Sequence, residues 1–293
     1  MARSRGTILI ATDGSDEGKA AVNAATTFPW PAGTRARGVV VRSRIAASEI
    51  PESVWADIER SLATVAEEAR KILARRWADA EVSVIDGPVV DAILSHAERV
   101  GARVIVVGSR GHGPIARLLV GSTSLGVVRG MKHAALVVRG RGRDFTRVAL
   151  GFDGSPDARR AATFLAGLDV PSGGQVTIIR VLEQTRMSSV SLLPSAARNA
   201  VLAGAAEVDA AAEQKAAREA ETVAAELRRA GWKVDIVLRK GAPLHELLAG
   251  TKRCRAQLLA LGARGHTAIE RLLLGSIVEG ALHRSPVSVL VTR

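Results

Sequence analysis

Short apolar runs alternate along the chain with longer segments in which apolar and charged residues mix. Val104–Val107 and Leu258–Leu261 are runs of four apolar residues, as expected for strands buried on both faces of a parallel sheet. In the first half, the pattern predicts strands near residues 7–12, 36–42, 80–85, 103–108 and 134–138, and helices near 16–27, 51–76, 88–100 and 122–130. In the second half, it predicts strands near 147–152, 175–182, 233–238, 256–262 and 287–291, and helices near 156–167, 206–230, 243–253 and 276–284.

This alternation of strands and helices predicts an α/β fold with doubly wound parallel sheets. In such sheets, ligands bind beyond the carboxyl ends of the strands, where the strand order reverses. Asp13 ends the first predicted strand and Gly108 ends the fourth. If those two strands are neighbours, both residues lie at one crevice.

The two halves of the chain are copies of one unit. Residues 7–15 match residues 147–155 at an offset of 140, whereas the later segments match at an offset of 154. The second copy therefore carries an insertion, expected within residues 183–205, where no regular pattern is visible. That segment is interpreted either as a lid-like loop or as an insertion that faces a partner protein.

The repeat predicts two domains, residues 1–140 and 145–293, joined by the basic linker Arg139–Arg143. Each is long enough to bury its own core. Because the linker is short, the two domains are expected to pack against each other as a pseudo-dimer.

A glycine pattern repeats after the fourth strand of each copy. Gly108-Ser-Arg-Gly111 is followed by nine residues and Gly121-Ser122, and Gly262-Ala-Arg-Gly265 is followed by nine residues and Gly275-Ser276. Glycine lets backbone N–H groups approach an anion, and a helix N-terminus adds unpaired donors and a favourable dipole. The pattern therefore predicts two phosphate-binding loops.

Composition narrows the class of protein. Hydrophobic residues make up 47% of the chain, no apolar stretch approaches the roughly 18 residues of a membrane span, and the N-terminus does not resemble a signal peptide. A single cysteine, Cys254, permits no intrachain disulfide, so a reducing cytoplasm is the expected location. The net charge of +12 raises the question of nucleic-acid binding. With no Tyr and four Phe for base stacking, an arginine-rich solvated surface is the favoured interpretation.

With both glycine patterns and both Asp-Gly-Ser strand ends in view, the chain resembles the universal stress proteins, specifically their tandem two-domain kind. His283-Arg-Ser-Pro286-Val-Ser-Val-Leu-Val291 completes the family pattern in the second copy, whereas the first copy has Arg129 and Lys132 at the His and Pro positions. The resemblance implies an adenine-nucleotide alpha hydrolase-like fold with strand order 3-2-1-4-5 in each domain and pairing through the fifth strands. It also implies ATP as the ligand, with Mg²⁺ left open, because ATP-binding members carry this glycine pattern.

The resemblance gives candidate roles in the first copy. Asp13 and the backbone at Val41 are expected to hold the adenine and ribose, and Gly108, Arg110, Gly111 and His112 to line the ribose and phosphates. The triphosphate is expected at Gly121, Ser122, Thr123 and Ser124. The second copy offers the equivalent set: Asp153, Val181, Gly262, Arg264, Gly265, His266, Gly275, Ser276, Ile277 and Val278. Ile277 and Val278 replace two hydroxyl residues, so the second site is expected to bind differently.

Structural alternatives stay open for these residues. Asp13 and Asp153, like Ser122 and Ser276, are also suited to cap helices, the glycines to make tight turns, and the arginines to be surface charges. The chain has no Walker motif, and neither a hydrolytic base nor a metal cluster is identifiable from its sequence. The leading hypothesis is an ATP-binding, stress-linked regulator with little or no hydrolysis. The alternatives are a slow ATPase or phosphotransferase, and an adaptor with a vestigial site that acts through an unknown protein partner. Association of two chains is left open.

Overall fold

The computed structural model describes residues 6–43, 52–110, 120–140, 145–182, 195–265 and 274–293. The first half contains β1 (Thr7–Ala11), α1 (Asp16–Thr27), β2 (Arg35–Arg42), α2 (Glu52–Ala74), β3 (Glu81–Asp86), α3 (Val89–Arg99), β4 (Ala102–Gly108), α4 (Ser122–Gly130) and β5 (Ala134–Val138). The second half contains β6 (Arg147–Gly151), α5 (Pro156–Ala166), β7 (Gln175–Leu182), α6 (Ser195–Arg229), β8 (Lys233–Lys240), α7 (Pro243–Arg253), β9 (Leu258–Gly262), α8 (Ser276–Arg284) and β10 (Ser288–Thr292). The predicted α/β class is confirmed.

The strands form one sheet in the order β3-β2-β1-β4-β5-β10-β9-β6-β7-β8. Neighbouring strands are parallel within each half, and the halves join through antiparallel β5 and β10, where Leu136 lies opposite Leu290. The strand order 3-2-1-4-5 and the pairing through the fifth strands are therefore confirmed. The two predicted five-stranded sheets are continuous, because this pairing satisfies the backbone groups along both inner edges.

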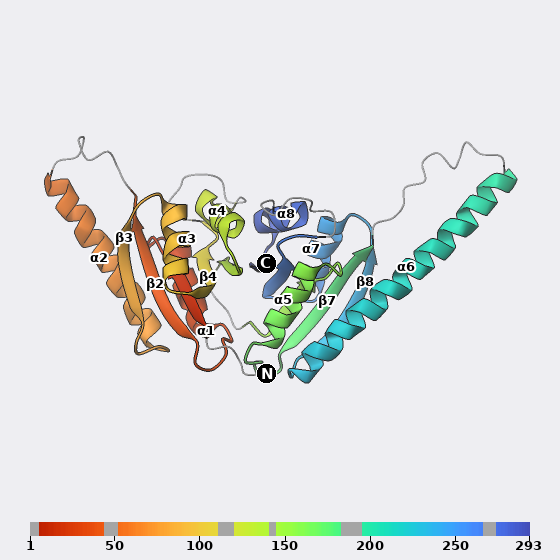
Figure 1. Ribbon diagram of the computed structural model, residues 1–293, viewed down its shortest axis with the longest axis horizontal. Coiled ribbons are helices and arrows are strands. Elements are labelled where there is room, and N and C mark those ends of the chain that lie inside the picture. Colours follow the sequence, from red (N-terminus) through yellow and green to blue (C-terminus); the bar gives the residue numbers. More distant parts are fainter. Residues whose placement is uncertain (1–5, 44–51, 111–119, 141–144, 183–194, 266–273) are drawn as a thin grey trace.

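Helices cover both faces of the sheet (Figure 1). One apolar core contains residues of α1, α2, α5 and α6, and the other contains residues of α3, α4, α7 and α8. Each core includes residues from both halves, and Phe28 of the first half lies 4.9 Å, between ring centroids, from Phe145, which precedes β6. The halves thus share their hydrophobic burial as well as a sheet.

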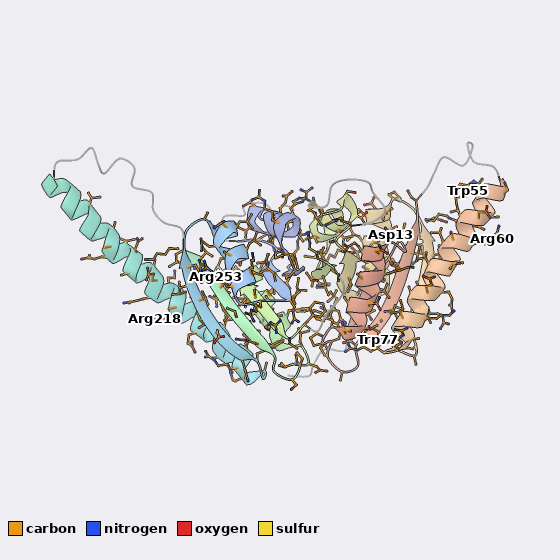
Figure 2. All side chains as sticks on the ribbon, turned by 180° about the vertical axis from the view of Figure 1, so that it is seen from behind. Asp13, Trp55, Arg60, Trp77, Arg218 and Arg253 are labelled. Carbon is orange, nitrogen blue, oxygen red and sulfur yellow. The ribbon has the colours of Figure 1, made fainter. Side chains whose placement is uncertain are left out.

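Helix α6 begins at Ser195, so the prediction of an irregular segment through residue 205 is wrong for residues 195–205. The segment is rich in alanine, which favours helix strongly enough to accommodate Gly204. Residues 183–194 lie outside the described residues. Figures 1 and 2 show that the amino-terminal ends of α2 and α6 extend away from the sheet, and Figure 2 labels Trp55 and Arg60 on this part of α2. No helix in the described ranges is long and apolar enough to cross a membrane.

Candidate functional site

A cavity of about 540 Å³ opens at the carboxyl edge of the strands in the first half. Its walls combine the ends of β1, β2 and β4, the amino ends of α1, α3 and α4, and one residue of the second half. Of the predicted first-site residues, it brings together Asp13, Val41, Gly108, Arg110, Gly121, Ser122, Thr123 and Ser124. The sequence predicted that Asp13 and Gly108 lie at one crevice if the first and fourth strands are neighbours. They are neighbours, because β1 and β4 are hydrogen-bonded to each other.

The turn after β1 is held by its own side chains. The carboxylate of Asp13 accepts a hydrogen bond from the backbone N–H of Ser15 at 3.0 Å, and the Ser15 hydroxyl accepts from Gly18 N at 3.1 Å. Ser15 is thus the N-cap of α1, and Asp13 is not, so the simple capping alternative for Asp13 is wrong. A Cβ at Gly18 would lie 2.5 Å from the Asp13 carboxylate, so glycine lets the helix start approach this side chain.

The glycines of the motif have two different physical causes. A Cβ at Gly108 would lie 2.6 Å from the carbonyl oxygen of Glu17, and one at Gly262 would lie 2.4 Å from the backbone nitrogen of Ala158. These two glycines are required by the close packing of α1 and α5. At Gly121 and Gly275, the nearest atoms to an added Cβ are 3.4 Å away, an ordinary contact. Packing of the described residues therefore gives no reason for glycine at those two positions.

Helix α4 begins beside the cavity without a side-chain cap. Gly121 is the N-cap and makes no side-chain cap hydrogen bond, and Gly275 has the same role in α8. Ser122 and Ser276 are accordingly first helical residues, not N-caps, which corrects that alternative. The Ser124 hydroxyl donates to the Gly108 carbonyl at 2.6 Å. Because this bond uses the only proton of the hydroxyl, the expected role of the Ser124 hydroxyl as a phosphate donor is not supported. The hydroxyl groups that remain to donate at the cavity are those of Ser122 and Thr123.

The second half repeats the arrangement with different side chains. The Asp153 carboxylate accepts from Ser155 N at 2.9 Å, and it lies 2.7 Å from where a Cβ of Gly265 would stand. Ser155 is the N-cap of α5, so capping does not explain Asp153 either. Val278 is 4% exposed in the apolar core and Ile277 packs against that core. Both residues therefore serve packing, where the first half has Thr123 and Ser124.

Each half has a pair of arginines with an acidic neighbour. In the second half, the Arg264 guanidinium donates to Asp157 at 2.8 Å, and this hydrogen bond raises the pKa of Arg264. Burial and repulsion from Arg264 lower the pKa of Arg293, against the opposite effect of Asp157. In the first half, burial and repulsion from Arg110 lower the pKa of Arg139, against the opposite effect of Glu17. Arg110 lines the cavity and supplies positive charge that favours an anion there.

Several predicted residues are not described, and several described ones were not predicted. Gly111, His112 and His266 lie outside the described residues, whereas Val181 packs against the apolar core that includes residues of α3, α4, α7 and α8. The cavity wall also contains residues that the sequence did not single out, among them Thr12, Val39, Val89, Ile93, Val120 and His283. Val39 carried a usable signal, since it lies in the predicted strand 36–42, but the motif itself gave no indication that His283 belongs to the other half's site.

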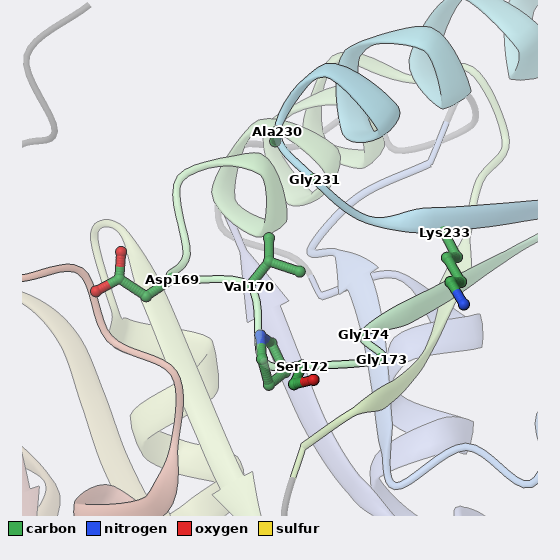
Figure 3. A pocket seen from close by; sticks show the side chains of 9 residues that line it. Asp169, Val170, Ser172, Gly173, Gly174, Ala230, Gly231 and Lys233 are labelled. Atoms are coloured by element: carbon green, nitrogen blue, oxygen red, sulfur yellow. The ribbon is translucent and has the colours of Figure 1, made fainter.

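A second cleft, of about 480 Å³, lies at the amino ends of β7 and β8 (Figure 3). It is formed by residues 169–174, before β7, and by residues around Gly231, before β8. None of the predicted ligand residues contributes to it. Among the described residues, no cluster of three or more His, Cys, Asp or Glu side chains is placed to hold a metal ion.

The fold and the cavity define a tandem α/β protein with a ligand crevice at the switch point of its first half. The sequence model of the universal stress protein family matches residues 4–139 and 144–293. The chain belongs to the universal stress protein family and carries two of its domains in tandem.

The chain is similar to individual universal stress proteins as follows. A universal stress protein of Mycobacterium tuberculosis is 30% identical over 204 residues, which cover 66% of this chain and 62% of the relative's length. The structure of a universal stress protein from Archaeoglobus fulgidus has the same fold, with a TM-score of 0.66, 22% identity and 98% of each chain covered. A universal stress protein solved in complex with cAMP is 26% identical and covers 46% of this chain and 99% of its own, with a TM-score of 0.39.

Proposed function

We propose that this protein is an ATP-binding stress regulator, with residues 1–140 and 145–293 as its nucleotide-binding domains and the cytoplasm as its location. The observation that carries the proposal is the first cavity, which places the Asp13 turn opposite the uncapped start of α4. Its volume of about 540 Å³ lies within the range of small-molecule sites. An apolar wall beside a set of N–H donors suits a ligand with an aromatic base and a phosphate chain.

The cavity offers a distinct surface to each end of such a ligand. Val39, Val41 and Ile93 form an apolar wall for the base, with the Asp13 carboxylate placed to accept hydrogen bonds from ribose hydroxyls. The backbone N–H groups at the start of α4, with the hydroxyls of Ser122 and Thr123, would donate to the phosphates. Arg110 supplies positive charge to the same end.

The proposal is binding with little or no hydrolysis. Every side chain assigned above binds or orients the nucleotide, and none is assigned to activate a water molecule. Bound nucleotide would then stabilise one arrangement of the loops at this edge, and that arrangement would be the regulatory signal. An enzyme of the same fold would instead turn ATP over at a rate that falls when the phosphate loop is altered.

The proposal is tested by enlarging the N-cap glycines. Gly121→Val and Gly275→Val should leave the fold intact, because the nearest atoms to a new Cβ are 3.4 Å away at both positions, while their side chains obstruct the approach of phosphate. Wild-type protein at an ATP concentration 100 times Kd should gain roughly 2.7 kcal/mol per site, seen as a rise in Tm. The double variant should lose that rise.

Gly204→Val is the matched control. Gly204 lies in α6, away from the cavity, and an added Cβ meets nothing within 4 Å. This variant should keep the full ATP-dependent rise in Tm. An unchanged rise in the double variant, or no rise in wild type at millimolar ATP, would contradict the proposed site.

A further inference from the structure

One wall of the first cavity is supplied by the second half of the chain. His283, in the last turn of α8, lines this cavity together with residues of the first half. The backbone N–H of Val120 donates to Nδ1 of His283 across the junction, at 3.4 Å. Because β5 and β10 pair antiparallel, the end of α8 that carries His283 comes to lie beside the start of α4, where the first half's glycine motif ends.

The position of the imidazole fixes which of its atoms is available to a ligand. In a neutral imidazole whose Nδ1 accepts a hydrogen bond, Nε2 carries the proton and is a donor. Val120 immediately precedes Gly121, the N-cap of α4. His283 therefore adds a side-chain donor next to the backbone donors of that helix.

The first half also holds the helix end that carries His283. The Arg139 guanidinium donates to the carbonyl oxygen of Leu282 at 2.9 Å, and the Arg139 backbone N–H donates to the Ser288 hydroxyl at 3.1 Å. These bonds fix the chain on both sides of His283 relative to β5. The imidazole is thus positioned by the junction between the halves.

The second site lacks this contribution. Arg129 occupies the position in α4 that His283 occupies in α8, at the repeat offset of 154. Its guanidinium donates to the carboxylate of Glu279 in α8 at 2.7 Å, and the residue equivalent to Glu279 in the first half is Leu125. Arg129 is therefore hydrogen-bonded to a carboxylate that has no counterpart in the first half.

We propose that His283 is a ligand-contacting residue of the first site, donating its Nε2–H to the phosphate chain of the nucleotide bound there. The first site is then composite, assembled from both halves, and it recognises phosphate more strongly than the second site does. The inference rests on the proposed nucleotide binding and adds to it a residue, a direction of contact and an asymmetry.

The test measures affinity by isothermal titration calorimetry. All variants are made in a parent protein that carries Gly275→Val, which obstructs the second site, so that the binding measured is that of the first site. ATP and adenosine are each titrated into the parent and into His283→Ala, His283→Phe and His283→Gln derivatives. Losing a hydrogen bond to a charged group should raise the Kd for ATP about tenfold in the Ala and Phe derivatives. The Kd for adenosine should stay within about twofold, because adenosine has no phosphate. Gln keeps an amide donor and should recover part of the ATP affinity.

His245→Ala in the same parent is the matched control and should keep the parent's affinity for ATP, because His245 lies in α7 with its side chain 78% exposed. The phenylalanine derivative replaces the imidazole by an aromatic ring without a hydrogen-bond donor and so fills the space, and the comparison stands even if the alanine derivative folds poorly. Equal losses for ATP and adenosine, or no loss for either, would overturn the role of His283 and leave the nucleotide site standing. A parent that binds neither ligand, when wild type also binds neither, would overturn both proposals.

Discussion

At the scale of single residues, one sequence motif combines glycines with different causes. Gly108 and Gly262 are glycine because the backbone at the start of α1 and of α5, respectively, lies where a Cβ would be, whereas Gly121 and Gly275 have ordinary room. Sequence alone could not separate the two kinds, because the distinction depends on the packing of α1 and α5, which are far away along the chain. Packing thus explains the residue type at Gly108 and Gly262, while the ligand contacts predicted for all four glycines stay a prediction.

This distinction predicts that two glycine-to-alanine substitutions differ in how much they lower the free energy of unfolding. Gly108→Ala should lower the free energy of unfolding by about 1–3 kcal/mol, the usual cost of forcing an atom into a packed site. Gly121→Ala should cost less, about 0.5–1 kcal/mol, because the only penalty there is that alanine is a poorer N-cap than glycine. Urea denaturation of both variants measures this, and equal stabilities would show that α1 can move away from Gly108 at little cost.

His96 predicts a dependence of stability on pH. It is 5% exposed in α3, and burial, followed by repulsion from Arg99, lowers its pKa below the ordinary 6.5. Above that value, His96 is neutral in both folded and unfolded chains. As the pH falls below it, the unfolded chain takes up a proton that the folded chain does not, so stability decreases until the folded pKa is reached.

The drop in Tm between pH 7.5 and pH 5.5 should therefore be smaller in His96→Gln than in wild type. His245→Gln is the control, since the side chain of His245 is 78% exposed. Calorimetry of the three proteins at both pH values measures the difference. An identical drop in His96→Gln and wild type would show that other groups dominate the acid response.

At the scale of elements, the sequence predicted the helices and strands that alternate regularly, and it failed where burial does not create a pattern. Helix α6 begins at Ser195 although its first part lies off the sheet, and Val208 is 68% exposed there. Residues 195–205 lack the apolar periodicity of a helix that buries one face, so they looked irregular in sequence. The site was predictable to the extent that it follows strand ends and the glycine motif, whereas His283 depends on the pairing of β5 with β10.

The two parts of α6 should respond differently to the same substitution. Ala220 is fully buried, whereas Ala210 is exposed on the projecting part. Ala220→Gly should lower the free energy of unfolding by about 1–2 kcal/mol, combining the lost helix propensity with a lost buried methyl group. Ala210→Gly should cost less than about 0.5 kcal/mol, because a helix end that buries little can unfold locally without the rest. Thermal denaturation compares them, and equal costs would mean that the projecting part is packed in solution.

At the scale of the whole molecule, the junction between the halves is part of both hydrophobic cores. Phe28, Leu136 and Leu290 belong to one core cluster, although they come from different halves. The backbone hydrogen bonds of β5 with β10, the Arg129–Glu279 pair and the bonds of Arg139 to α8 cross the same boundary. Contacts this dense predict that the two domains unfold together, although each repeat is long enough to form a core.

Leu290→Ala tests this coupling, because the residue is fully buried in β10 opposite Leu136. The substitution should cost about 2–5 kcal/mol. Of the four tryptophans, Trp30, Trp55 and Trp77 lie in the first half, so their fluorescence should report an unfolding midpoint lowered as much as the calorimetric one. Leu238→Ala, at a side chain 39% exposed on the edge strand β8, should shift neither midpoint appreciably. A fluorescence midpoint that stayed at the wild-type value while the calorimetric trace split in two would mean that the halves unfold independently. The first site could not then depend on the second half for a positioned His283, because the junction that holds His283 would itself be weak.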